Sequence, residues 1–251
     1  ESSAASDVYK RQVCVPIVES HDEAILNKLK EFNELEVDMI ELRIDFYENI
    51  HQEDALRNLF LNIAALQIQK PVILTIRTAA EGGEVEIDPK DYFNVYKLAV
   101  EANAFDIYDV ELALGTNMAI ELRTLIHDAG KYMLMSSHNF DRTPEVDSLM
   151  QKFRSMDSLE ADIMKVAVMP EDYQDLLNLL SFTVQAKHEY AQKPIVTMSM
   201  SSIGLTSRLV GEQFGSAITF ASVGKASAPG QIDYQELNQM LDIIHKNIQE
   251  A

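Results

Sequence analysis

Short apolar runs rich in β-branched residues alternate along the chain with longer segments whose apolar positions recur every three or four residues. The short runs predict buried strands, and the longer segments predict amphipathic helices that cover them. We expect strands at 12–18, 38–44, 72–77, 106–112, 131–137, 162–168, 195–200 and 217–222. We expect helices at 22–35, 53–67, 89–102, 117–129, 144–159, 171–190, 207–214 and 233–248.

A strand followed by a helix, repeated at intervals of roughly 30 residues, is typical of the (β/α)8 barrel, an α/β fold. The rival is a doubly wound open sheet, but no Gly-x-Gly-x-x-Gly turn follows the first expected strand. With 47% hydrophobic residues and no Pro/Gly/Ser-rich linker, we expect one catalytic barrel domain over 11–251. Residues 1–10 are small and polar, and we expect a disordered tail or a cloning remnant there.

The formal net charge of −19 argues against nucleic acid or an anionic membrane as a partner, because both require clustered Lys and Arg. A small anionic substrate remains compatible with it. No window approaches the roughly 18 apolar residues of a membrane span, so we expect a cytoplasmic protein. The single cysteine, Cys14, excludes an internal disulfide and a cysteine-based metal site.

Lys165 lies in the middle of an apolar run, where burial disfavours the protonated amine. We therefore expect a lowered pKa and a neutral, nucleophilic amine of the kind that forms imines. The alternatives are a lysine paired with a buried carboxylate and a lysine whose amine reaches out to solvent from the end of the strand.

The active site of a barrel lies where its strands end, so polar residues there are candidates for function. Alternation along the second strand directs Glu41 and Arg43 into the barrel mouth, although they could instead form a structural ion pair. Arg77 ends the third strand. The glycine pair at 82–83 then allows hinge motion and brings Glu81 near the mouth, where the alternative is an ordinary solvated carboxylate.

His138 is the only histidine at an expected strand end, which makes it the candidate general acid and base. Because no second histidine accompanies it, we do not expect a histidine-rich metal site, although the rim carboxylates leave a hard cation possible. We expect the remaining histidines to lie on helices or their edges, exposed and inert: His21, His51, His127, His188 and His245.

Arg208 falls in the first turn of the expected helix at 207–214, where free N–H groups, the helix dipole and a guanidinium together suit a carboxylate or phosphate. After the last strand, Ser227 and Gln231 lie in a loop dense in turn residues and can hydrogen-bond hydroxyl or carboxylate oxygens. Together with Arg43 and Arg77, these residues predict an anionic, hydroxyl-rich ligand.

These residues resemble the type I 3-dehydroquinate dehydratases of the shikimate pathway. The motifs that carry the resemblance are Glu-Leu-Arg at 41–43, Arg-Thr-Ala-Ala-Glu-Gly-Gly-Glu at 77–84, Ser-His-Asn-Phe at 137–140, Lys-Val-Ala-Val-Met-Pro at 165–170, Ser-Arg-Leu at 207–209 and Ala-Ser-Ala-Pro-Gly-Gln at 226–231. The resemblance implies a (β/α)8 barrel, usually a homodimer without metal or cofactor, that converts 3-dehydroquinate to 3-dehydroshikimate by syn loss of water.

By resemblance, Lys165 is the imine-forming lysine, His138 is the general base and acid, and Glu81 is the carboxylate that orients His138. The residues that match the family's substrate-binding positions are Glu41, Arg43, Arg77, Arg208, Ser227 and Gln231. Pro16 departs from the pattern, because some relatives have a hydroxyl residue there. We expect a substrate contact to be missing at Pro16 and the chemistry to survive.

Two other hypotheses compete with this one. A class I aldolase also uses a barrel lysine as an imine, but it would cleave its substrate into two carbonyl products. A catalytically inactive barrel that serves as a binding protein should lack a member of the reactive trio, whereas Lys165, His138 and Glu81 are all present.

Overall fold

The computed structural model describes residues 11–224 and 230–249. The strands are β1 (Gln12–Ile17), β2 (Met39–Arg43), β3 (Val72–Thr75), β4 (Ile107–Glu111), β5 (Tyr132–Asn139), β6 (Ile163–Val168), β7 (Ile195–Ser199) and β8 (Ile218–Phe220). The α-helices are α2 (Asp22–Asn33), α3 (Glu53–Ala65), α4 (Pro89–Ala102), α5 (Thr116–Asp128), α6 (Val146–Ser158), α7 (Tyr173–Glu189), α8 (Gly211–Phe214) and α9 (Tyr234–Gln249). Short 3-10 helices lie at η1 (Ile44–Phe46), η2 (Ala79–Glu81), η3 (Leu112–Leu114) and η4 (Leu205–Arg208).

The order of the strands defines the fold. It runs β7-β6-β5-β4-β3-β2-β1-β8 in one eight-stranded sheet, so strands that follow one another in the chain are neighbours and the last pairs with the first. The pairs of β1 with β8, β2 with β3, β3 with β4, β4 with β5 and β6 with β7 are parallel. Parallel strands with helical crossovers in this order form a (β/α)8 barrel, which confirms the predicted fold class.

The chain divides into two compact units. Unit 1 contains Glu1–Val15, His138–Arg154 and Met164–Ala251, and unit 2 contains Pro16–Ser137 and Ser155–Ile163. The predicted tail at 1–10 lies outside the described residues, and the boundaries of one catalytic domain at 11–251 stay a prediction. Cys14 is fully buried in β1 and packs as a small core residue.

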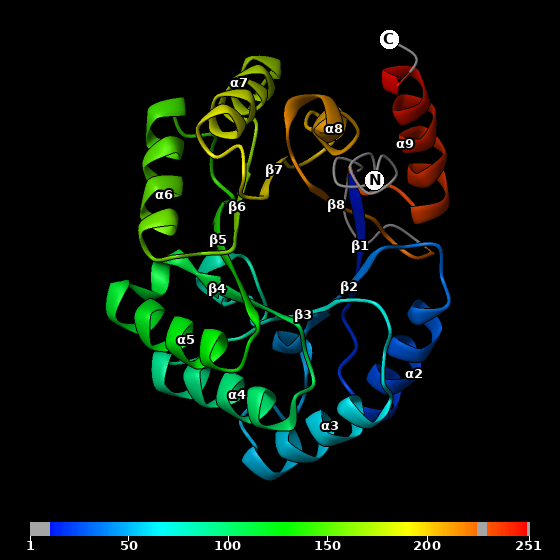
Figure 1. Cartoon of the computed structure of the whole chain (residues 1–251), viewed down its shortest axis with the longest axis vertical. Helices are drawn as coiled ribbons and strands as arrows, with labels where there is room; N and C mark the ends of the chain where they lie inside the picture. Colours follow the sequence, from blue (N-terminus) through cyan, green and yellow to red (C-terminus); the bar gives the residue numbers. More distant parts are fainter. Residues whose placement is uncertain (1–10, 225–229, 250–251) are drawn as a thin grey trace. The chain divides into compact units, whose positions relative to one another are not determined.

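In unit 2, helices α3, α4 and α5 lie side by side along strands β2 to β5 (Figure 1). A cluster of buried aromatic rings joins the two layers, with Tyr96 and Tyr108 in edge contact at 5.3 Å between centroids. The hydroxyls of Tyr92 and Tyr96 both donate to the carbonyl of Asp109. Because buried hydroxyls need hydrogen-bond partners, these contacts fix helix α4 against the middle of β4, which carries Asp109.

In unit 1, helix α7 packs against β7, and the hydroxyls of Thr183 and Thr197 lie 2.7 Å apart across that contact. The backbone N–H of Ala217 donates to the carbonyl of Ile195 at 2.8 Å, which connects the start of β8 to β7. Strand β6 is buried over most of its length and carries Lys165, whose position opposite Val196 fixes its height along the strands. The pairing of β6 with β7 therefore sets the position of Lys165 along the strands.

The prediction of one helix over 207–214 is wrong. The chain there forms η4, then Leu209 and Val210, and then the separate short helix α8. Arg208 therefore ends a 3-10 helix and does not occupy the first turn of an α-helix. The interruption coincides with a long-range contact: a Cβ at Gly211 would lie 2.4 Å from the guanidinium carbon of Arg11, so the backbone of α8 packs directly against that side chain. The expected contribution of a helix dipole to an anion site is lost.

The two glycines of the loop after β3 are needed for two reasons: a positive φ, which a Gly-Gly pair allows, and a close backbone contact, which the sequence did not indicate. Gly82 has φ 86° and ends η2 in the left-handed conformation. A Cβ at Gly83 would lie 1.9 Å from the carbonyl oxygen of Arg77, so only glycine fits there. The expected hinge motion of this pair stays a prediction.

We predict that Gly83→Ala lowers the free energy of unfolding by about 3 kcal/mol, because the new methyl group must displace backbone. The control is Gly130→Ala, where φ is +72° but no atom lies within 4 Å of the new Cβ. That variant should lose only about 1 kcal/mol from backbone strain. Urea unfolding measures both, and equal losses would contradict the packing argument.

Candidate active site

Lys165 is buried in β6, with 6% of its surface exposed. Its Nζ atom lies 4.1 Å from the centroid of the Phe220 ring, which belongs to β8. The aromatic face supplies an attractive partner for a cation, whereas burial favours the neutral amine. The burial contradicts the alternative of an amine that reaches out to solvent.

Arg208 is joined to the same strand as the lysine's aromatic neighbour. Its Nη1 donates to the carbonyl of Phe220 at 3.5 Å, and its own carbonyl accepts from the hydroxyl of Thr219 at 2.9 Å. Burial lowers the pKa of Arg208. Lys165 and Arg208 are therefore both anchored around Phe220, within unit 1.

His138 lies within β5, which continues to Asn139, two residues beyond the expected end of the strand. Its ring is half-buried and stacks on Phe140, with centroids 6.2 Å apart and planes inclined by 13°. The side chain of Asn139 accepts from the backbone N–H groups of Asp141 and Arg142 at 3.0 and 2.9 Å. The strand therefore ends at Asn139, and His138 is its second-to-last residue.

Two of the histidines expected to be exposed and inert are neither. His127 is half-buried and its Nε2 lies 2.8 Å from Asp162, and His245 is half-buried and bonded to Glu212. Both acids come from other elements, so spacing along the helix gave no signal of the pairs. His21 is exposed on its helix edge but forms a hydrogen bond with Glu48, which raises its pKa. His51 and His188 are exposed, as predicted.

Glu41 and Arg43 lie on β2 in unit 2, but they do not form the ion pair that was the alternative to function. Glu41 accepts from the hydroxyl of Thr75 at 2.8 Å. Arg43 binds Asp45 through two hydrogen bonds of 2.9 and 2.8 Å. Burial lowers the pKa of Arg43, but the bonds to Asp45 and the charge of Glu41 outweigh it and raise the pKa overall.

Arg77 lies at the centre of a buried network in unit 2. Its guanidinium donates to Asp109 at 2.9 Å, to Glu111 at 2.7 Å and to the hydroxyl of Ser136 at 3.0 Å. Burial works against the charge, but Asp109 and Glu111 raise the pKa of Arg77 far above its usual range. The hydroxyl of Thr78 also donates to Glu111, at 2.6 Å. Arg77 is thus held rigidly by two carboxylates.

The other predicted residues lie in loops. Glu81 ends η2 and is 9% exposed, so it is not an ordinary solvated carboxylate. Gln231 is half-buried beside Gly230, where a Cβ would lie 2.5 Å from the carbonyl oxygen of Ser201. This close approach fixes that end of the loop against the turn after β7. Ser227 lies outside the described residues.

Sequence reasoning missed several members of these clusters. Phe220 gave no signal, because nothing in the sequence shows that its ring faces Lys165. Asp109 and Glu111 did give one, because carboxylates at alternate positions of an apolar strand must lie on one face and need partners. The remaining missed residues are Asp45 and Ser136, which the fold brings to Arg43 and Arg77.

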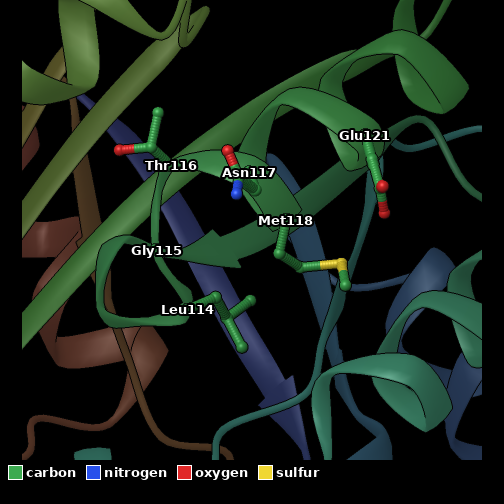
Figure 2. A pocket seen from close by; sticks show the side chains of 6 residues that line it. All are labelled: Leu114, Gly115, Thr116, Asn117, Met118 and Glu121. Atoms are coloured by element: carbon green, nitrogen blue, oxygen red, sulfur yellow. The ribbon is translucent and has the colours of Figure 1, made fainter.

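Two open pockets lie in unit 2. One of about 370 Å³ is at the start of α5 and is lined by Leu114, Gly115, Thr116, Asn117, Met118 and Glu121 (Figure 2). The second, of about 530 Å³, includes Thr78 and Glu111. The residues that line these pockets include none of the predicted site residues. The candidate site is therefore identified from the reactive and charged side chains and not from these two pockets.

The described residues contain neither a metal-binding cluster nor a membrane-spanning helix. No group of three or more His, Cys, Asp or Glu side chains is placed to hold a metal ion. No helix among those residues combines the length and the apolar character that crossing a bilayer requires.

The barrel and the charged side chains at its strand ends place the chain among the (β/α)8-barrel enzymes. The model of the family described as type I 3-dehydroquinase matches residues 13–248, and the chain belongs to that family. Its relatives are 3-dehydroquinate dehydratases, which are hydro-lyases, and this chain is an enzyme of that kind.

The relatives match over nearly their whole lengths. The chain is 39% identical to a 3-dehydroquinate dehydratase of Bacillus subtilis and 40% identical to one of Enterococcus faecalis, over 94% of this chain and 92% and 93% of theirs. The crystal structure of a type I 3-dehydroquinate dehydratase from Clostridium difficile has a TM-score of 0.91 and 36% identity, over 95% of this chain and 94% of that one. These matches favour the dehydratase over the aldolase and the inactive barrel.

We predict that Glu111→Gln lowers the free energy of unfolding by about 3–5 kcal/mol, because it leaves part of the Arg77 charge buried and unpaired. The control is Glu53→Gln, which breaks the exposed pair of Glu53 and Arg57 on α3. That change should cost less than about 1 kcal/mol. Chemical denaturation compares the two, and a loss below 1 kcal/mol for Glu111→Gln would show that the network does not stabilise the fold.

Proposed function

We propose that the enzyme removes water from 3-dehydroquinate by syn elimination, through an imine between Lys165 and the substrate ketone, to give 3-dehydroshikimate. The observation that carries the proposal is the burial of the Lys165 amine against the face of Phe220. A buried primary amine is the group that an imine mechanism needs, because desolvation keeps a fraction of it neutral and nucleophilic. The C. difficile relative, whose structure contains covalent modified comenic acid, supports covalent chemistry in the family.

The first step joins enzyme and substrate. The neutral amine of Lys165 attacks the C3 carbonyl carbon, and the carbinolamine loses the carbonyl oxygen as water, which leaves a C=N bond. The protonated imine carries a positive charge next to C2. The face of the Phe220 ring, 4.1 Å from Nζ, stabilises that cation.

The second step is the elimination. The iminium withdraws electrons from the C2–H bond, so the half-buried His138 imidazole removes that proton as a general base. The electron pair forms an enamine and then expels the hydroxyl group from C1. The same imidazole, now protonated, donates its proton to the departing hydroxyl, so water leaves from one face. Glu81 orients the imidazole in this scheme.

The last step restores the enzyme. Water adds to the conjugated imine carbon, the C–N bond breaks, and the product ketone departs from Lys165. His138 transfers protons to and from the carbinolamine in this step, as in the first. The cycle needs no oxidant or reductant, because it forms one C=C bond and releases one water.

Substrate binding uses the charged and hydroxyl-bearing residues. Arg208 binds the substrate carboxylate, since it is a buried cation without a carboxylate partner in the part of the chain that is described. Glu41 and Arg43 contact substrate hydroxyls from β2. Arg77 acts as a fixed hydrogen-bond donor at the rim, because Asp109 and Glu111 restrict its guanidinium. Ser227 and Gln231 complete the set from the loop after β8.

The wider setting is also part of the proposal. The reaction belongs to the shikimate pathway of aromatic amino acid biosynthesis, with 3-dehydroquinate as the small-molecule partner. We propose that residues 11–251 form one cytoplasmic catalytic domain that acts as a homodimer without metal. The net charge of −19 supports the absence of nucleic acid and membrane partners.

Reduction with borohydride in the presence of 3-dehydroquinate tests the imine. We expect a stable adduct on the peptide that contains Lys165, because borohydride converts the C=N bond to an amine. Omission of the substrate is the control and should leave the peptide unmodified. An adduct on another lysine, or none, would remove Lys165 from its role.

We predict that His138→Ala lowers kcat about 100-fold or more, because a general acid and base contributes that much. The control is His188→Ala, an exposed position on α7, and it should keep the activity of the parent enzyme. The ultraviolet absorbance of the conjugated product measures both rates. Near-normal turnover by His138→Ala would contradict the assignment.

A further inference from the structure

Arg11 is a buried cation to which the proposed reaction assigns no task. It precedes β1 and is 2% exposed. Its Nη1 donates to the carbonyl of Ser207 at 3.1 Å, and its Nη2 donates to the carbonyl of Ile218 at 3.4 Å. One guanidinium therefore joins η4, which carries Arg208, to the first residue of β8.

The hydrogen bond from Arg11 to Ser207 satisfies a carbonyl group at the end of η4. The last carbonyl groups of a helix have no partner inside it, and those of η4 include Ser207 and Arg208. Arg11 satisfies the first, and the hydroxyl of Thr219 satisfies the second at 2.9 Å. Both donors come from the side of β1 and β8. The backbone on either side of the Arg208 Cα atom is thereby fixed to the sheet.

The guanidinium of Arg11 is also held by the chain that follows η4. A Cβ at Gly211 would lie 2.4 Å from its Cζ and 2.5 Å from its Nε. The backbone of α8 therefore covers the guanidinium directly. Arg11 is confined between η4, α8 and β8, and it has little freedom to move independently of Arg208.

Among the residues that the structure describes, no carboxylate pairs with the buried charge of Arg11. Burial and the charge of Arg208 lower the pKa of Arg11 to about 9. Within residues 11–224 and 230–249, neither guanidinium is paired with a carboxylate, and the Nε atoms of both are buried without a hydrogen-bond partner. Two buried cations in such a position repel each other, and an anion bound at Arg208 relieves that repulsion.

We propose that Arg11 is a positioning residue that holds Arg208 in place and strengthens its attraction for the carboxylate of the substrate. This inference rests on the proposed function, in which Arg208 binds that carboxylate. Arg11 fixes the carbonyl group of Ser207, immediately before Arg208 in the chain, and adds a second positive charge behind the binding guanidinium. It does not touch the reacting atoms.

A purely structural role makes a different prediction. If Arg11 only tied η4 to β8, its loss would lower stability and leave the substrate's KM unchanged in the folded enzyme. If Arg11 positions Arg208, its loss raises KM and leaves kcat nearly unchanged, because the chemistry takes place at Lys165 and His138.

The test compares Arg11→Met with the parent enzyme, using 3-dehydroquinate and the absorbance of the product. We expect KM to rise about 10-fold, the equivalent of one lost charge-assisted interaction, with kcat within about 2-fold of the parent value. Arg11→Lys keeps the charge and one of the two hydrogen bonds, so its KM should lie between that of the parent enzyme and that of Arg11→Met. The control is Arg57→Met, an exposed position on α3, which should leave both constants unchanged.

Arg208→Ala and the double variant separate this inference from the proposed function. If Arg208→Ala raises KM and adding Arg11→Met raises it no further, the two arginines act as one unit, as proposed. An unchanged KM in Arg208→Ala would refute the carboxylate site itself. A raised KM in Arg208→Ala, with a KM within about 2-fold of the parent value in Arg11→Met, would overturn the role of Arg11 alone.

The folded state is checked by the thermal midpoint of each variant. Should Arg11→Met fail to fold, Arg11→Lys decides the question. A raised KM with unchanged kcat in that variant supports positioning, and a parental KM overturns it. An equal fall of kcat and rise of KM also overturns the proposal, because it indicates general damage to the site.

Discussion

The candidate site depends on keeping one amine away from water. Lys165 lies in an apolar strand with 6% of its surface exposed, and its Nζ atom lies over the face of the Phe220 ring. In the proposed mechanism, burial favours the neutral amine that attacks the ketone, whereas the aromatic face favours the cationic imine that follows. The same surroundings thus suit the lysine before and after it reacts.

The buried arginines of the two units differ in their partners. In unit 2, Arg43 is paired with Asp45, and Arg77 is paired with Asp109 and Glu111, so these carboxylates fix the directions of the two guanidinium groups. In unit 1, Arg11 and Arg208 bond to backbone carbonyl groups, and no carboxylate among the described residues neutralises them. An arginine that is paired with a carboxylate has a fixed direction for its N–H groups. An arginine without a carboxylate partner keeps a positive charge that can attract an anion. A polyhydroxylated carboxylate needs both, because its hydroxyl groups require direction and its anionic group requires a counterion.

Much of this architecture was predictable from the sequence, because strand and helix periods are local properties. Apolar runs located every strand, and alternation put Glu41 and Arg43 on one face of β2. Prediction failed where long-range packing decides the outcome. The helix expected over 207–214 is interrupted where the side chain of Arg11, 200 positions from Gly211 in the chain, packs against that glycine. Likewise, Phe220 could not be linked to Lys165, nor Asp162 to His127, without the fold. The six motifs nevertheless indicated the family correctly, and the matching model covers residues 13–248.

The central claim is that the substrate ketone passes through a C=N bond to Lys165, and the fate of its oxygen tests this most directly. Forming the imine expels the C3 oxygen as water, and hydrolysis restores an oxygen from the solvent. Turnover in water enriched in oxygen-18 should therefore label the C3 carbonyl of the product in a single turnover. Mass spectrometry of the product, corrected for exchange without enzyme, gives the result. Product that retains the original oxygen would contradict the account.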